Sequence, residues 1–294
     1  MQELSEIIKE SGLDACCAEG VVAADDATEQ GDVADDYVGE DGLLVCGRCG
    51  QPKQKRIELE FREKPLVVSI PCECEKRAEE EREARERRAA AAEKAKKARH
   101  ECFHDCAAYQ SCTFESDDRL NPKRSDVCQR YADTFDKSDP CGLLLWGDVG
   151  TGKSFMASAI ANRVIDRGYS ALVTDIGSIV SLMESSFDDR RRNLDRILRY
   201  DLLVIDDLGA QRGSEYMMEH VYSVIDGRYR SGRPMVITTN FDADEIKDKH
   251  DSERWGRIID RILECCYPVE FKGKSRRRVN STVMRSKMRE RLGL

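Results

Sequence analysis

The sequence predicts an α/β protein in which a parallel sheet flanked by helices follows a small cysteine-bearing module and a charged helix. Three observations predict this architecture. From about Cys112 onward, short apolar runs alternate with segments of helical periodicity, which is typical of a parallel sheet covered on both faces. A glycine-rich loop separates the first apolar run from a helix. Ahead of them, two cysteine pairs precede a stretch of alanine and charged residues.

The composition excludes several classes of protein. The 294 residues, 40% of them hydrophobic and 35% charged, allow one sizeable α/β domain with smaller appendages. No apolar run approaches the ~18 residues of a membrane helix, and the acidic start lacks a signal-peptide pattern. We therefore expect a cytoplasmic protein without a membrane partner. In that reducing compartment, the thirteen cysteines favour metal binding over disulfides.

The charge is unevenly distributed. Residues 1–42 carry thirteen acidic residues and one lysine, a net charge of −12, with no apolar period, and we expect a largely disordered tail. Residues 275–294 carry seven Lys or Arg against one Glu, and we expect a basic C-terminal helix over 279–294. This asymmetry is compatible with a nucleic-acid partner, although a solvated surface is its commoner meaning.

Residues 43–74 contain a C-x2-C pair and a C-x-C pair, formed by Cys46, Cys49, Cys72 and Cys74. Four thiolates can close a tetrahedral zinc site, and the intervening "RIELEF" and "LVVSI" resemble strands, so the segment predicts a zinc ribbon. So short a segment has too little core to fold alone, and zinc would supply the missing stability. The alternative is four unrelated reduced cysteines.

Residues 75–111 predict a charged helical linker. Residues 75–99 are almost wholly Ala, Glu, Lys and Arg, which favour helix and form opposite-charge pairs at i,i+4. The uncharged residues are all alanine, so no broad apolar stripe is available for a core. A solvated spacer is favoured over a docking helix.

Residues 112–278 hold the predicted α/β domain. Its apolar runs predict strands at 142–146, 170–175, 201–209, 234–240 and 267–271. Its periodic segments predict helices at 153–168, 179–200 (one or two helices), 214–232 and about 252–264.

The glycine-rich loop "GDVGTGKS" matches the phosphate-binding pattern G-x-x-x-x-G-K-[ST] between a strand and a helix. Its glycines allow a tight turn in which backbone N–H groups converge on phosphate oxygens, and the helix adds its positive end. Lys153 supplies charge for the β- and γ-phosphates, and Ser154 is a Mg²⁺ ligand. The predicted ATP-binding residues here are Gly147, Asp148, Val149, Gly150, Thr151, Gly152, Lys153 and Ser154.

Polar residues end two later strands. Asp206 and Asp207 end the strand at 201–209; Asp206 would hold Mg²⁺ with Ser154, and Asp207 would polarise an attacking water. Asn240 ends the strand at 234–240. It would orient water or contact the γ-phosphate, or alternatively cap the next helix.

Arginines near the C-terminus are further candidates. Arg257 and Arg261 lie at i,i+4 and share a helix face, and Arg254 precedes them. One of the three would act on a neighbouring subunit's nucleotide as an arginine finger, or all belong to a solvated, salt-bridged face. The basic cluster at 272–278 suits the nucleotide's phosphates or nucleic acid.

The run "CTFESDD…GLLLWGDVGTGKSFMASAIANRVIDRG…LLVIDDLGA…VITTN…RIIDRI" resembles the bacterial replicative-helicase loaders of the DnaC/DnaI type. These are AAA+ ATPases similar to the IstB-type transposition ATPases. The resemblance covers residues 112–278. The loop is generic, whereas "VIDDLG", "ITTN" and "RIIDR" are more particular to this group.

The resemblance implies roles by position: Lys153 and Ser154 in Walker A, Asp206 and Asp207 in Walker B, Asn240 as sensor 1, Arg261 as the finger, and Arg276 or Arg277, preferably Arg277, as sensor 2. Asp207 departs from the Glu usual in AAA+ proteins, which bears on turnover, although Asp is common in this subgroup.

The function implied by the resemblance is ATP-dependent loading of a replicative helicase onto single-stranded DNA. Subunits would assemble as an ATP-dependent homo-oligomer, and the N-terminal region would dock the helicase hexamer. The alternative is an IstB-like ATPase that assists a transposase in target selection. The zinc ribbon and charged spacer favour the loader. A third class, a DNA-binding scaffold that holds ATP without hydrolysing it, stays open because of Asp207.

Overall fold

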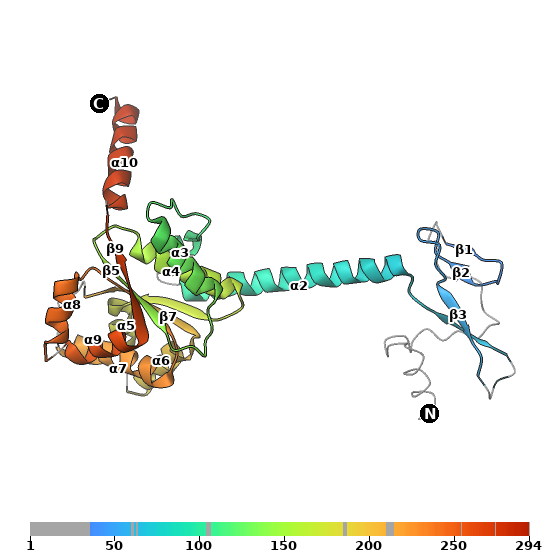
Figure 1. Ribbon diagram of the computed structural model, residues 1–294, viewed down its shortest axis with the longest axis horizontal. Coiled ribbons are helices and arrows are strands. Elements are labelled where there is room, and N and C mark those ends of the chain that lie inside the picture. The colour runs from blue at the N-terminus through green and yellow to red at the C-terminus, as the bar shows by residue number, and fades with distance from the viewer. Residues whose placement is uncertain are drawn as a thin grey trace. The chain divides into compact units, whose positions relative to one another are not determined.

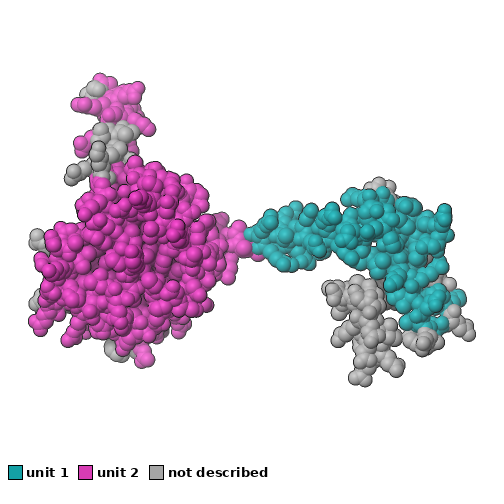
Figure 2. All heavy atoms as spheres, viewed as in Figure 1, with its two compact units in different colours: residues 1–89 teal, residues 90–294 magenta. Residues whose placement is uncertain are grey.

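The structure is a computed structural model with two compact units, residues 1–89 and 90–294, coloured separately in Figure 2. The first 35 residues, which hold most of the predicted acidic tail, lie outside the described residues. The described residues are 36–59, 62, 64–103, 107–184, 187–209, 215–253, 255–273 and 275–293. Among them, no helix is both long enough and apolar enough to cross a membrane.

The first unit contains two small antiparallel sheets. They pair β1 (Tyr37–Val38) with β2 (Leu44–Val45), and β3 (Gln54–Ile57) with β4 (Leu66–Ser69). The strand expected at "RIELEF" is present as β3, but it begins two residues earlier. The described structure also starts before the expected boundary at residue 43, because β1 lies within the predicted tail.

The charged segment forms helix α2 (Glu73–Cys102), which begins two residues before and ends three residues after the charged run 75–99 but stops short of the predicted linker end at residue 111. Its first turn carries acidic residues and its last turn basic ones, an arrangement that complements the helix dipole. Cys102 is its only buried residue. Ala95 and Ala98 near its C-terminal end pack against the core of the second unit.

The second unit is built on a five-stranded sheet, of which Figure 1 labels β5, β7 and β9. The strand order is β6-β7-β8-β5-β9, and every neighbouring pair is parallel. The strands are β5 (Gly142–Gly147), β6 (Ala171–Asp175), β7 (Leu202–Leu208), β8 (Met235–Thr239) and β9 (Cys266–Phe271). The helical elements are η2 (Ala107–Ser111), α3 (Pro122–Asp133), α4 (Lys153–Asp166), α5 (Ile176–Met183), α6 (Phe187–Arg199), α7 (Glu215–Ser231), α8 (Ala243–His250), α9 (Gly256–Cys265) and α10 (Arg276–Leu292).

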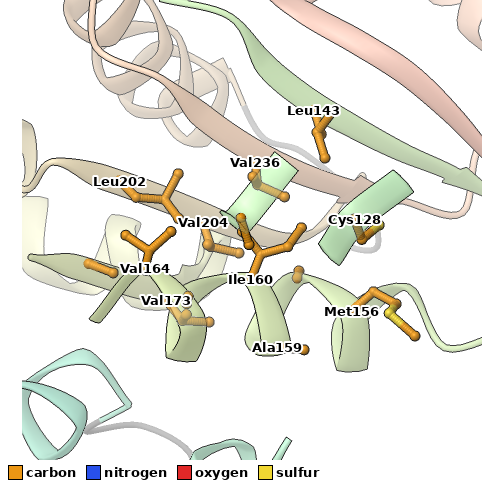
Figure 3. Close-up of a cluster of buried hydrophobic side chains, with 14 of the residues drawn as sticks. Cys128, Leu143, Met156, Ala159, Ile160, Val164, Val173, Leu202, Val204 and Val236 are labelled. Atoms are coloured by element: carbon orange, nitrogen blue, oxygen red, sulfur yellow. The ribbon is translucent and has the colours of Figure 1, made fainter. Parts of the chain in front are cut away.

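Alternate strand residues pack on opposite faces of this sheet. Leu143 and Leu145 of β5 join a buried cluster with residues of α3 and α4. Leu144, between them, joins a second cluster with residues of α5, α6, α7 and α9. Figure 3 shows Ile160 of α4 beside Val204 of the sheet. Burial on both faces explains why the strands are continuous apolar runs.

The predicted elements differ from the structure mainly at their ends. The segment 179–200 is two helices, α5 and α6, and the helix expected from about residue 252 begins at Gly256. The basic C-terminal helix begins at Arg276, three residues before the expected start. Neither η2 nor α3 was expected, because both precede the first periodic segment.

Candidate functional site

The phosphate loop, the acidic pair Asp206 and Asp207, and Asn240 lie close together because the strands that precede them, β5, β7 and β8, are adjacent and parallel. The carboxyl ends of parallel strands lie at one edge of a sheet, where open α/β sheets bind ligands. A cavity of about 360 Å³ lies at this edge. Ten of the candidate residues line it: Val149, Gly150, Gly152, Lys153, Ser154, Asp206, Asp207, Asn240, Arg276 and Arg277.

The phosphate loop needs glycine because a neighbouring segment packs against it. Gly150 and Gly152 have φ angles of 80° and 101°, in the left-handed region that disfavours side chains. A Cβ on Gly150 would lie 2.2 Å from Ser275 Oγ, and one on Gly152 would lie 2.8 Å from the Arg276 guanidinium. Gly147 is also left-handed. The loop therefore runs close to the start of α10.

Two further loop residues support its backbone. Thr151 is buried, and its hydroxyl donates to the carbonyl of Asp148 at 2.8 Å. The Asp148 N–H donates to the Phe271 carbonyl at 3.0 Å. Helix α4 begins directly after the loop, so its first-turn amides lack partners within the helix and can bind an anion.

Lys153 is almost fully buried, with 6% of its surface exposed. Its Nζ donates to the carbonyls of Gly147 and Asp148 at 2.8 and 2.7 Å. Burial lowers the pKa of the ammonium, while the nearby carboxylates, foremost Asp207, oppose that shift. A positive charge partly removed from water interacts strongly with an anionic group.

The acidic pair lies in a β-bulge. Strand β7 pairs regularly with β8 up to Ile205 opposite Ile237, and pairing resumes with Leu208 opposite Thr239. Asp206 and Asp207 therefore both lie opposite the single residue Thr238. Bulges are frequent beside active sites, where they redirect side chains.

Asp207 and Asn240 form a hydrogen-bonded pair. The Asn240 Nδ2 donates to Asp207 Oδ1 at 2.6 Å. Partial burial and the charge of Asp206 raise the pKa of Asp207, while Lys153 and Arg277 oppose the increase. A carboxylate with a raised pKa is better suited to accept a proton from water.

The alternative for Asn240, that it caps the next helix, is wrong. Asp242 is the N-cap of α8: its side chain accepts from the Glu245 N–H at 2.8 Å, and the Glu245 carboxylate accepts from the Asp242 N–H. This capping box leaves the Asn240 amide available to Asp207.

The two sensor candidates have different surroundings although both line the cavity. The Arg276 guanidinium pairs with Asp118 at 2.8 Å and lies 3.4 Å from Asp117, whose side chain is almost fully buried. The charge of Arg277, by contrast, lowers the pKa of both Lys153 and Asp207. Arg277 therefore acts electrostatically on Lys153 and Asp207, whereas Arg276 is held by two acidic side chains.

Arg261 lies on α9 and does not line the cavity. Its Nε donates to Asp226 at 2.6 Å, and its guanidinium lies over the rings of Tyr222 and Tyr229, 5.2 and 5.5 Å from their centroids. The neighbouring Arg257 is exposed, and Arg254 lies outside the described residues.

The cavity also contains four residues that sequence reasoning did not select: Tyr109, Cys112, Phe155 and Thr238. Asn162 of α4 anchors η2, because its Nδ2 donates to the carbonyls of Tyr109 and Cys112 at 3.1 and 2.8 Å. The Tyr109 hydroxyl thereby lies 3.4 Å from Asp206 Oδ2. Thr238 belongs to the "ITTN" motif, which signals it, whereas the approach of η2 leaves no sequence signal.

The cysteine pairs form a separate candidate site in the first unit. The sulfurs of Cys46, Cys49, Cys72 and Cys74 all lie within 4.8 Å of one another, and no other such ligand group occurs among the described residues. Cys74 Sγ is 3.4 Å from Cys46 Sγ and 3.1 Å from Cys72 Sγ. A tetrahedral Zn–S₄ centre with bonds of about 2.3 Å separates its sulfurs by about 3.8 Å, so the four side chains fit zinc.

A second, looser set of cysteines and histidines, made up of "HECFHDC" (100–106), Cys112 and Cys128, has a spacing that fits no common zinc ribbon, and its described members form no metal-ligand group. Cys102 and Cys128 are buried in the hydrophobic core, and Cys112 lines the cavity. His104 and Cys106, which the same cluster would need, lie outside the described residues.

A parallel sheet with a phosphate loop, an acidic pair and a polar residue at its strand ends defines a nucleotide-binding protein of the phosphate-loop class. The family described as "IstB-like ATP binding protein" matches residues 72–283. The chain therefore belongs to this family. The match extends beyond the region 112–278, which carries the motifs, at both ends.

Curated relatives agree with this assignment. The chain is 27% identical over 180 residues to the replicative helicase loader DnaI of Bacillus subtilis (strain 168), covering 56% of this chain and 58% of that protein. It is 30% identical over 147 residues to the replicative helicase loader DnaC of Escherichia coli (strain K12), covering 47% and 59%. The chain thus spans less than two thirds of the length of these relatives.

One solved structure supports the fold. A crystal structure of the DnaC helicase loader matches with a TM-score of 0.51 and 21% identity, covering 57% of this chain and all of that one. At this identity the likeness shows the fold alone.

Proposed function

We propose that the chain binds and hydrolyses Mg²⁺-ATP in the cavity at the carboxyl edge of its sheet. The observation that carries this proposal is the convergence of the phosphate loop, Asp206, Asp207, Asn240 and Arg277 on one cavity. These groups come from separate segments, and each has a chemical task in phosphoryl transfer.

In this proposal the phosphate loop and Lys153 bind the β- and γ-phosphates, and Ser154 and Asp206 hold Mg²⁺. Asp207 polarises the attacking water, with Asn240 holding its carboxylate. Arg277 stabilises negative charge on the phosphates of the nucleotide that its own chain binds. Arg261 acts on the nucleotide of a neighbouring subunit, and its release from Asp226 accompanies assembly.

We further propose that this ATPase loads a replicative helicase onto single-stranded DNA. The similarity to two proteins named replicative helicase loaders supports this role. The cysteine site would hold zinc, and the module around it would bind the helicase hexamer. Structural zinc would stabilise a module in which Cys46 and Cys72 are the only buried side chains among its described residues.

Steady-state ATPase measurements with and without single-stranded DNA test the first proposal. We expect magnesium-dependent turnover that Lys153→Ala abolishes. ATP binding without basal or DNA-stimulated turnover would instead support the scaffold that holds ATP.

Partner capture with the full chain tests the second proposal. Recovery of a hexameric helicase, lost in a Cys46→Ser/Cys49→Ser variant, supports loading through the zinc module. Recovery of a transposase would favour the alternative, target selection by an IstB-like ATPase, which the family assignment keeps open.

A further inference from the structure

The β-bulge that presents the acidic pair leaves a hydrogen-bonding problem. In a regular ladder, each residue of β7 would have its own partner on β8, but Asp206 and Asp207 share Thr238. A bulge leaves its extra residue unpaired. The structure must therefore satisfy the Asp207 N–H and orient the Asp206 carboxylate with the groups of one opposing residue.

The Thr238 hydroxyl meets both requirements. It donates to Asp206 Oδ1 at 2.6 Å and accepts from the Asp207 N–H at 2.8 Å. A hydroxyl can do both at once because it carries one donor and two acceptor lone pairs. With 1% of its surface exposed, Thr238 has little access to water that could replace either bond.

The conformation of Asp207 makes this support necessary. Its φ of 56° lies in the left-handed region, and only one other described non-glycine residue, Arg119, has a positive φ. Such backbone conformations persist only where the surroundings determine them. The bond from Asp207 N–H to Thr238 restrains the backbone, and the bond from Asn240 restrains the Asp207 carboxylate.

We propose that Thr238 is the positioning residue of the Mg²⁺ and water sites: its single hydroxyl fixes the Asp206 carboxylate and the backbone of Asp207. This inference rests on the proposed function, in which Asp206 holds Mg²⁺ and Asp207 polarises water. Thr238 itself need not touch the nucleotide. Its role is to keep the two acids in the relative orientation that the reaction requires.

Thr239, the next residue, offers a matched control. It is equally buried, and its hydroxyl also makes two bonds, donating to the Leu208 carbonyl at 2.8 Å and accepting from the Phe241 N–H at 3.2 Å. Neither bond involves a carboxylate. Thr239→Val therefore removes as many buried hydrogen bonds from the same strand as Thr238→Val does, without affecting the acidic pair.

The experiment compares the full-length chain with Thr238→Val, Thr238→Ser and Thr239→Val. For each we measure kcat and KM for ATP, the Mg²⁺ concentration giving half-maximal turnover, and the affinity for a fluorescent ATP analogue without Mg²⁺. We expect Thr238→Val to lower kcat by about 10- to 100-fold, because small misplacements of reacting groups have effects of this size. It should also raise the Mg²⁺ midpoint and leave metal-free nucleotide affinity near that of wild type.

Thr238→Ser keeps the hydroxyl and should restore most of kcat, while Thr239→Val should retain wild-type kcat. Equal loss of kcat in both valine variants, or a serine variant as impaired as Thr238→Val, would overturn the inference. If Thr238→Val does not fold, Thr238→Ala is measured in its place.

The outcomes for the wild type separate this inference from the proposed function. If the wild type binds Mg²⁺-ATP but does not hydrolyse it, the proposed ATPase activity is refuted. The role of Thr238 is then tested by comparing the Mg²⁺ concentration for half-maximal nucleotide binding between the wild type and Thr238→Val. A wild type that binds no nucleotide overturns both.

Discussion

Loss of one cysteine from the zinc module should unfold that module and leave the ATPase unit intact. Cys74→Ser is the sharpest change, because its sulfur lies within 3.4 Å of both Cys46 Sγ and Cys72 Sγ. Among the described residues of the first unit, Cys46 and Cys72 are the only buried hydrophobic side chains. The two contribute on the order of 3 kcal/mol by burial, so the proposed zinc would supply most of the stability of the module.

The magnitude follows from the ligand count. Structural zinc sites in small modules contribute about 10–16 kcal/mol at neutral pH, or on the order of 3 kcal/mol for each of four thiolates. Since 1.4 kcal/mol is about tenfold in affinity, we expect Cys74→Ser to weaken zinc binding at least about a hundredfold. Zinc content after dialysis and competition with a colorimetric chelator measure the effect.

Cys141→Ser is the control, because Cys141 is exposed in the second unit and belongs to no metal-ligand group formed by the described residues. It should keep one zinc per chain. Limited proteolysis should cut the first unit of Cys74→Ser rapidly, while its ATPase activity without partners stays at the wild-type value. Full zinc occupancy in Cys74→Ser, or an unchanged proteolysis pattern after chelation of the wild type, would refute the reasoning.

Three further outcomes concern the second unit. Lys153→Ala should abolish nucleotide binding in calorimetry because it removes the buried ammonium, but leave zinc content unchanged; loss of zinc would contradict the division into two units. The kcat should fall on the acid side at a pH above the ordinary aspartate pKa of 3.8, because the pKa of Asp207 is raised and the protonated acid cannot accept a proton. Arg277→Gln removes a positive charge that opposes this increase and should move the fall in kcat to higher pH. A shift to lower pH would count against Asp207 as the base. Leu145→Ala should cost about 2–5 kcal/mol in urea unfolding, since Leu145 is fully buried, whereas Leu120→Ala, at a residue 63% exposed, should cost almost nothing; equal midpoints would disprove the assigned core.

The sheet could be predicted because its strands are buried on both faces. Runs such as Leu202–Ile205 are apolar at every position, a pattern that needs no tertiary information to recognise. The phosphate loop could likewise be predicted, because its sequence motif lies between a strand and a helix. Helix ends were less predictable, because they depend on local caps such as the Asp242 capping box.

The parts of the site that could not be predicted depend on contacts between segments that are far apart in the sequence. Tyr109 reaches Asp206 from η2, a segment whose Tyr109 carbonyl is held by the buried Asn162, more than 50 residues further along the chain. The "ITTN" motif points to Thr238, but its contact with both acids follows from a register shift that the motif does not reveal. The surroundings of Arg261 follow from the packing of α9 on α7, which a shared helix face cannot reveal.

The junction between the phosphate loop and α10 has a practical meaning for work on this chain. The Arg276 N–H donates to the Gly150 carbonyl at 2.8 Å, and the first two residues of α10 form part of the cavity wall. A deletion of the whole basic helix α10 would therefore remove part of the cavity wall as well as the positive charge. Charge-neutralising substitutions from Arg285 onward leave the cavity wall in place, so they separate the effect of the basic charge from the effect of the first residues of α10 on the cavity.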